Sequence, residues 1–199
     1  DSNGPSESEA RMLVEHIEAT NNYINTDAPA IKSASDVKIA MQADEVHLID
    51  IRAKDDYDNG HIEDAVHVEL TNVLNYVEGL DDPHAKDLII ICYTGQSAAY
   101  TTALLRLAGY DNAYSLKFGM ASWSMEHTGK WDNNVSNARA TQFVTEVTEK
   151  PDPETLPDLN TGESNGEDIL RARVEQVFSE GFGPAKITHN DVFQDTDNY

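Results

Sequence analysis

The 199-residue chain lacks the residues that several protein classes need. Its single cysteine, Cys92, excludes an intramolecular disulfide framework and a zinc site built from several cysteines. Basic residues are scarce, with 14 Lys and Arg against 36 Asp and Glu, and the formal net charge is −22. Because so acidic a surface repels a phosphate backbone, we expect no nucleic-acid partner. Apolar runs extend over only a few residues, so we also expect no membrane span.

The N-terminal segment has the composition of a solvated tail. Residues Asp1–Glu9 are mostly Ser, Asn, Gly, Pro and Glu. Tails of this kind often follow a cleaved export signal, so we favour an exported protein, in the periplasm or cell envelope, over a cytoplasmic one. A capping box formed by Ser6 and Glu9 then predicts a helix over residues 8–22.

Short apolar strands alternate with helices in the middle of the chain. Strands are expected at 46–51, 65–68, 88–91 and 113–116. Helices are expected after a capping box at Ser33 and Asp36, at 71–77, and at 97–108, where Gly109 ends the helix. This order is typical of an α/β domain with a central, mostly parallel sheet flanked by helices on both faces. The four apolar residues of 88–91 predict that this strand is central and buried.

The C-terminal third has a different composition. Residues 149–167 contain three prolines, two glycines and many acids, which is typical of a linker. A capping box at Ser164 and Glu167 predicts one more helix, ended by Gly181. The segment Thr188–Val192 then repeats the pattern of Ser33–Val37.

The cysteine directly follows the predicted central strand and precedes a glycine-containing loop and a helix. In this position the loop N–H groups can point at the sulfur, and with the positive end of the helix dipole they would favour a thiolate. The alternative interpretation is that Cys92 is a small core residue. If the thiolate is the nucleophile, the candidate substrate-binding residues are those of the cradle: Tyr93, Thr94, Gly95, Gln96, Ser97 and Ala98.

Three roles of a loop cysteine require residues that this chain does not supply. A phosphatase needs an arginine six residues after the nucleophile to clamp the phosphoryl oxygens, and that position is Ala98. Thiol–disulfide exchange needs a second cysteine. A Cys–His hydrolase needs a histidine base, and the spacing singles out none of the seven histidines. The remaining role is that of a lone nucleophile that accepts a group able to leave as easily as it arrived, and sulfane sulfur is the obvious candidate.

Three motifs, in order, make the chain resemble the rhodanese family of sulfurtransferases over residues 31–133. Leu48–Arg52 followed by Tyr57–Ala65 is similar to the family's Asp-x-Arg and Gly-His-Ile signature. Cys92–Ser97 resembles its six-residue active-site loop, and Phe118–Trp123 resembles its C-terminal Gly-Gly-x-x-x-Trp signature. Together the three motifs are far more specific than any one of them.

The resemblance implies that Cys92 takes sulfur from a donor such as thiosulfate, holds it as a persulfide, and passes it to cyanide or a thiol. In this family the six-residue loop is associated with sulfur substrates, and a loop one residue longer with phosphate-type substrates. A protein sulfur acceptor is a further implied partner. No cofactor and no metal are expected. A carrier or sensing module that serves a protein partner without much free turnover is the alternative, and retention of Cys92 argues against a catalytically idle scaffold.

Two positions depart from the family pattern, and the loop carries no cation. Asp64 and Met120 stand where glycines are usual, which affects local turns more than chemistry. Some thiosulfate-using members have a basic loop residue, whereas the nearest candidates here are Arg52 and Lys117. For Arg52 we favour a supporting role, in which it and Asp50 fix the turn below the site.

The resemblance also organises the chain. We assign 1–28 to the acidic tail and N-terminal helix, 29–135 to the rhodanese-like domain, 136–166 to a linker, and 167–199 to a C-terminal helix. The repeated capping pattern at Thr188 has two interpretations of equal weight: the start of a second, truncated rhodanese-like domain, or a chance recurrence of a common motif. The strong negative charge predicts that added salt lowers the KM for an anionic donor.

Overall fold

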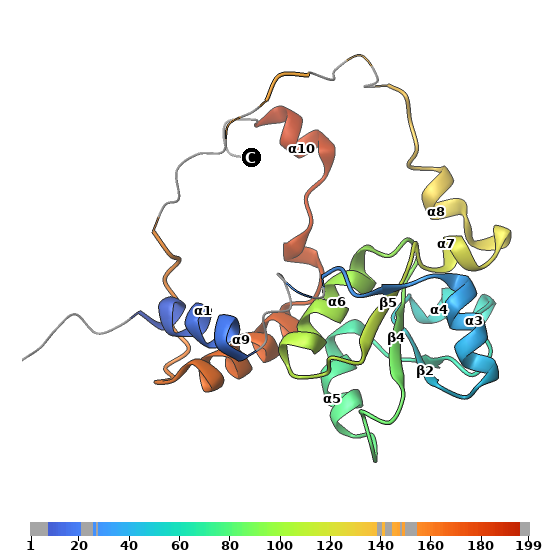
Figure 1. Ribbon diagram of the computed structural model, residues 1–199. Helices are drawn as coiled ribbons and strands as arrows, with labels where there is room; N and C mark the ends of the chain where they lie inside the picture. Colours follow the sequence, from blue (N-terminus) through green and yellow to red (C-terminus); the bar gives the residue numbers. More distant parts are fainter. Residues whose placement is uncertain are drawn as a thin grey trace, which may run out of the picture.

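The computed structural model describes residues 8–20, 26, 28–138, 141, 145–147, 149 and 155–195. At its centre is a five-stranded sheet with the order β1-β5-β4-β2-β3, in which every described pair is parallel (Figure 1). The strands are β1 (Ile31–Lys32), β2 (Val46–Asp50), β3 (Val66–His67), β4 (Asp87–Ile91) and β5 (Ala113–Leu116). The four predicted strands are confirmed, and so is the central place of 88–91, because β4 lies between β5 and β2.

Alternate residues of β4 face opposite sides of the sheet, as the two-residue period of a strand requires. Leu88 and Ile90 belong to one buried cluster, whereas Ile89 and Ile91 belong to another. Because both faces are covered, all four side chains are apolar and almost fully buried. The sequence therefore shows a continuous apolar run at this strand instead of an alternating one.

Helices cover both faces of the sheet. Helices α5 (Val73–Glu78), α6 (Gln96–Leu107) and α9 (Gly166–Glu180) pack against the face that includes Ile90. Helices α3 (Ala34–Gln42) and α7 (Met120–Trp123) pack against the face that includes Ile89. The other helical segments are α1 (Glu9–Thr20), α4 (Lys54–Asn59), η1 (Leu70–Asn72), η2 (Met125–His127), α8 (Gly129–Asp132), η3 (Gly183–Ala185) and α10 (His189–Gln194).

Two helices that are far apart in the sequence, α1 and α9, pack together beside the sheet. In Figure 1, α1 lies along α9, and α9 contributes Leu170, Val174 and Phe178 to the core cluster of β4. The Glu9 carboxylate accepts hydrogen bonds from the N–H groups of Thr161 and Gly162, at 2.7 and 3.1 Å. Helix α9 is thus part of the same hydrophobic core as the sheet, although it is distant in sequence.

Several local predictions need correction. Strand β1 and the short helices α4, α7 and α8 were not expected, because segments of two to six residues carry too little periodicity. The N-terminal helix begins after Ser8, whose Oγ accepts from the N–H of Arg11, and Ser6 lies outside the described residues. Helix α9 is capped by Asn165 instead of Ser164, because the Asn165 side chain accepts from the N–H of Asp168.

The two similar capping motifs share two side-chain hydrogen bonds, and at Ser33 the N–H also donates to the Asp36 carboxylate. Ser33 Oγ accepts from the N–H of Asp36 at 3.1 Å, and Thr188 Oγ1 accepts from the N–H of Asp191 at 3.2 Å. In both, the hydroxyl also donates to the aspartate carboxylate, at 2.6 Å. The capped helices at both ends are therefore confirmed. Helix α10 stands apart from the sheet in Figure 1, so the question of a second domain stays a prediction.

Candidate active site

Cys92 lies at the carboxyl end of β4, on the face of the sheet that α6 covers. Its residue exposure is 2%, and its Sγ accepts a hydrogen bond from the N–H of Gly95 at 3.1 Å. Gly95 adopts a left-handed conformation, with φ of 100°, and is the N-cap of α6. This turn brings the sulfur to the positive end of a twelve-residue helix, where a negative charge is favoured.

The cradle of N–H groups around the sulfur is only partly engaged. Among Tyr93–Ala98, all of which the structure describes, Gly95 is the residue whose N–H donates to Sγ. Gln96, Ser97 and Ala98 form the first turn of α6, where N–H groups have no intrahelical acceptor. Those donors are oriented with the helix axis and could bind a charged sulfur species larger than the thiol itself. The Ala98 side chain faces the core and is fully buried.

The segment Phe118–Ala121 supports the loop through backbone hydrogen bonds. The N–H of Met120 donates to the carbonyl of Cys92 at 2.8 Å, and the N–H of Ala121 donates to the carbonyl of Tyr93 at 3.1 Å. Gly119 lies so close to the loop that an added Cβ would be 2.8 Å from the amide nitrogen of Thr94. The third motif of the sequence therefore acts as a backbone support for the second.

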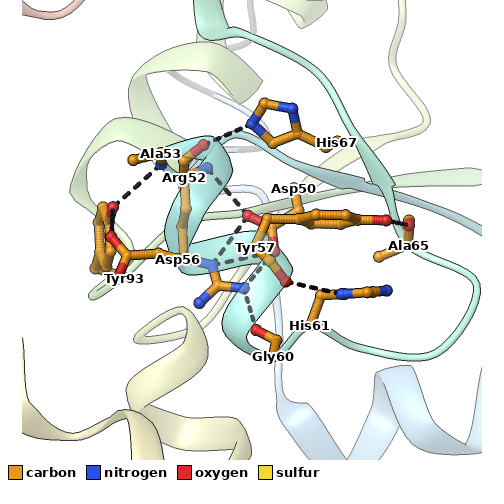
Figure 2. Close-up of polar contacts among 10 residues, drawn as sticks. All are labelled: Asp50, Arg52, Ala53, Asp56, Tyr57, Gly60, His61, Ala65, His67 and Tyr93. Carbon is orange, nitrogen blue, oxygen red and sulfur yellow. Dashed lines mark hydrogen bonds and ion pairs between the residues drawn. The ribbon is translucent and has the colours of Figure 1, made fainter.

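Asp50 and Arg52 form a buried ion pair beside the site (Figure 2). The guanidinium donates to both carboxylate oxygens at 2.8 to 3.1 Å and to the carbonyl of Gly60 at 2.7 Å. The Arg52 N–H donates to the same carboxylate at 3.0 Å. The side chain of Arg52 is 2% exposed and that of Asp50 is 0% exposed. The pair connects the end of β2 to the loop that follows α4. The positive charge of Arg52 is thus already neutralised.

Tyr93 connects the active-site loop to α4. Its hydroxyl donates to Asp56 Oδ2 at 2.5 Å and accepts from the N–H of Ala53 at 3.1 Å (Figure 2). Burial, followed by the hydrogen bond to Asp56, raises the pKa of Tyr93 above its ordinary value. The phenol therefore stays protonated at neutral pH and anchors the loop. Lys130 Nζ, from α8, lies over the Tyr93 ring, 5.1 Å from its centroid.

The structure separates the remaining predicted residues. Thr94 and Ser97 are partly exposed and Gln96 is exposed, all on the loop itself. Lys117 is exposed and lies 5.5 Å from the ring of Phe118. It is absent from the linings of the cavities of about 340 and 410 Å³ beside the loop, both of which include Lys130. Sequence reasoning missed Lys130, because nothing in its local pattern marks it as a site residue.

Comparisons with known proteins agree with this geometry. The model of the rhodanese-like domain matches residues 33–126. The thiosulfate sulfurtransferase GlpE of Shewanella oneidensis is 30% identical over 82 residues, which cover 41% of this chain and 79% of the relative. The chain belongs to the rhodanese family.

Two further matches complete the comparison. GlpE of Pseudomonas entomophila is 30% identical over 94 residues, covering 46% of this chain and 83% of the relative. A rhodanese-like domain protein from Staphylococcus aureus is similar in structure with a TM-score of 0.42 and 18% identity, covering 48% of this chain and 91% of the other. At family level the chain is thus a rhodanese-like sulfurtransferase with an α/β fold.

The structure gives reasons for the two departures from the family pattern. Asp64 has a φ of 63°, so it adopts the conformation for which glycine is usual, and aspartate is one of the few other residues that tolerate it. Met120 begins α7 and is 2% exposed, with its side chain in the core cluster of Ile89. Its side chain therefore occupies core space away from the thiol, and its N–H still supports the loop.

In the part of the chain that the structure describes, no helix combines the length and apolar character needed to cross a membrane. Within the same residues, no three His, Cys, Asp or Glu side chains come together as a metal site would require.

Proposed function

We propose that this rhodanese-family protein transfers sulfane sulfur from thiosulfate or a similar donor to cyanide or a thiol through a Cys92 persulfide. The observation that carries the proposal is the hydrogen bond from Gly95 N–H to Cys92 Sγ at the start of α6. The amide and the start of the helix are directed at one sulfur, so they would stabilise negative charge that develops on it during the reaction. The thiosulfate sulfurtransferase relatives support the choice of donor.

The proposed reaction has two balanced steps. The thiolate of Cys92 attacks the outer sulfur of thiosulfate, the Sγ–S bond forms, the bond to the sulfonate sulfur breaks, and sulfite leaves with the electron pair. Cyanide then attacks the terminal sulfur of the persulfide, thiocyanate leaves, and the thiolate is regenerated. The free N–H groups of the first turn of α6 would stabilise the negative charge that remains on the cradle in both steps.

Intact mass spectrometry tests this proposal directly. The full chain and the Cys92→Ser variant are incubated with thiosulfate, and cyanide is then added. We expect the wild-type chain alone to gain the mass of one sulfur atom and to lose it with cyanide. No gain in the wild-type chain would contradict thiosulfate as a donor, and a gain in the variant would contradict the role of Cys92.

A carrier that serves a protein partner is the second candidate, and one observation favours it. Phe118 and Trp131 form an edge-to-face ring pair with centroids 5.7 Å apart, next to the segment that supports the loop. They are 50% and 48% exposed, so the paired rings form an exposed aromatic surface beside the loop that a protein partner could cover. This candidate predicts sulfur loading from a protein persulfide together with slow turnover of thiosulfate, measured by the same mass shift.

A further inference from the structure

Arg52 and Lys117, the two basic residues that the sequence analysis considered, are not placed to bind an anionic donor beside the loop. The guanidinium of Arg52 is buried and shared between Asp50 and the carbonyl of Gly60. Lys117 is exposed over the ring of Phe118 and lines neither cavity next to the loop. Neither residue therefore replaces the missing basic residue of the loop, and an anionic donor such as thiosulfate would approach a strongly acidic protein.

Lys130 of α8 is a cation that lies beside the loop. Its ammonium lies 5.1 Å from the ring centroid of Tyr93, the residue that follows the nucleophile. It lines both cavities beside the loop, so it stands between them. Among the described residues, no carboxylate forms an ion pair with it. Its charge is thus not neutralised by a partner.

The two cavities differ in charge. The smaller, of about 340 Å³, has ionisable groups of both kinds in its lining, the acids Asp56 and Glu126 and the bases Arg52, His127 and Lys130. The larger, of about 410 Å³, is lined by Thr94, Gln96, Lys130, Trp131, Asn134 and Val135. Lys130 is the only ionisable residue of that lining, and it is positive on a chain with a net charge of −22. The hydroxyl of Thr94 and the amide of Gln96 come from the active-site loop itself and add hydrogen-bond donors.

We infer that Lys130, with Thr94 and Gln96, forms the subsite through which anionic sulfur donors reach Cys92. This inference rests on the proposed function. Lys130 supplies the positive charge that binds an anionic donor on an otherwise acidic protein. A sulfonate or carboxylate group binds near the ammonium while the sulfur end faces the loop. The shared chemistry is a negative charge next to a transferable sulfur, and thiosulfate fills only part of the cavity. Larger anionic persulfides therefore fit the same subsite.

The test compares two alkylating reagents of similar size that differ in charge. Iodoacetate is an anion and iodoacetamide is neutral, and their rate constants with Cys92 are measured by intact mass for wild type, Lys130→Gln and Lys38→Gln. Lys38 is a matched control, because it is an exposed lysine over an aromatic ring, that of Trp123 at 4.5 Å, and it lines neither cavity. Both variants carry the same net charge.

We expect Lys130→Gln to lower the iodoacetate-to-iodoacetamide rate ratio by about three- to tenfold. The attraction between two unit charges at contact distance in water changes a rate constant by about this factor. Lys38→Gln should leave the ratio within about twofold, because screening removes the effect of a distant exposed charge. Equal ratios in the two variants would overturn the inference. A fall in both rate constants of Lys130→Gln would also overturn it, because that result indicates a displaced loop.

Thiosulfate kinetics provide the second arm. Lys130→Gln should raise the KM for thiosulfate about fivefold at low salt and leave kcat unchanged, because an ammonium that binds the donor contributes mainly before the chemical step. If the wild-type chain takes no sulfur from thiosulfate, the proposed donor is wrong. The alkylation ratio then still decides the role of Lys130, so the two proposals fail separately.

Discussion

Gly119 lies directly against the active-site loop, so closely that no side chain fits between it and the carbonyl oxygen of Cys92. It has a φ of 55° and a ψ of −150°, a conformation that is almost restricted to glycine. The next residue, Met120, donates its N–H to that same carbonyl at 2.8 Å. The position of Cys92 thus depends on a close approach between two segments that are far apart in the sequence.

Gly119→Ala should destabilise the protein by about 3–5 kcal/mol, because it combines backbone strain with a clash against the loop. The control is Gly109→Ala, since Gly109 also has a positive φ, of 100°, but has nothing within 4 Å of an added Cβ. The control should cost about 1–2 kcal/mol from strain alone. Urea unfolding measures both, and equal losses would show that the contact with the loop is unimportant.

Arg52→Ala should cost about 3–5 kcal/mol of unfolding free energy, because it leaves the carboxylate of Asp50 buried and unpaired. Lys54→Ala removes the neighbouring ion pair with Asp58, in which both side chains are more than half exposed. That change should cost about 0–1 kcal/mol. If the two losses measured by urea unfolding are similar, the buried pair does not hold the turn below the site.

Phe178→Ala tests whether α9 belongs to the domain. The Phe178 side chain is 2% exposed and contacts the core cluster of β4 and α6, so its loss should cost about 3–5 kcal/mol. Phe193→Ala in α10, where the side chain is 49% exposed, should change stability by less than about 0.5 kcal/mol. Thermal unfolding with a single transition in both variants would agree with one core; an early transition in Phe178→Ala confined to α9 would not.

The contact between Glu9 and the segment before α9 predicts a pH dependence. Hydrogen bonds from Thr161, and also from Gly162, lower the pKa of Glu9 below its ordinary value of 4.5. A lowered carboxyl pKa adds stability that is complete above 4.5 and is lost as the pH falls through the folded-state value. Wild type should therefore melt at a higher temperature than Glu9→Gln at pH 6, with the difference shrinking below pH 4.5. A difference that does not change with pH would contradict this assignment.

The KM for thiosulfate should fall as ionic strength rises. A net charge of −22 repels the dianion at low salt, and added salt screens this repulsion beyond a Debye length, which is about 10 Å at 0.1 M. The fall should be steeper in Lys130→Gln, because that variant lacks the short-range attraction. Steady-state assays from low to high sodium chloride measure this, and a flat or rising KM in wild type would show that the surface field does not reach the site.

Much of the site was visible in the sequence because its parts are local. A cysteine after four apolar residues, followed by a glycine and a helix, specifies strand, turn and helix from consecutive residues, and the structure has them in that order. The pairing of Asp50 with Arg52 could also be anticipated, since the two lie two residues apart and both fall at a strand end. The capping motifs at Ser33 and Thr188 are local in the same way.

The parts that escaped prediction join distant segments or are very short. Strand β1 has two residues and exists because β5 pairs with it. Lys130 and the ring of Tyr93 are 37 positions apart, and their contact depends on how α8 folds back over the loop. The caps of α1 and α9 shifted by one or two positions because adjacent polar residues compete to accept the same first-turn N–H groups.

The sequence by itself determined the family, the α/β class and the strand, loop and helix around Cys92, because apolar periodicity and the motifs are encoded in neighbouring residues. Only the tertiary structure decided that Gly119 supports the loop, that Arg52 is neutralised, that α9 completes the core, and that Lys130 lies over the ring of Tyr93 beside the loop. Each of these depends on chain packing over long sequence separations, where exclusion of volume and the pairing of buried charge select the contacts.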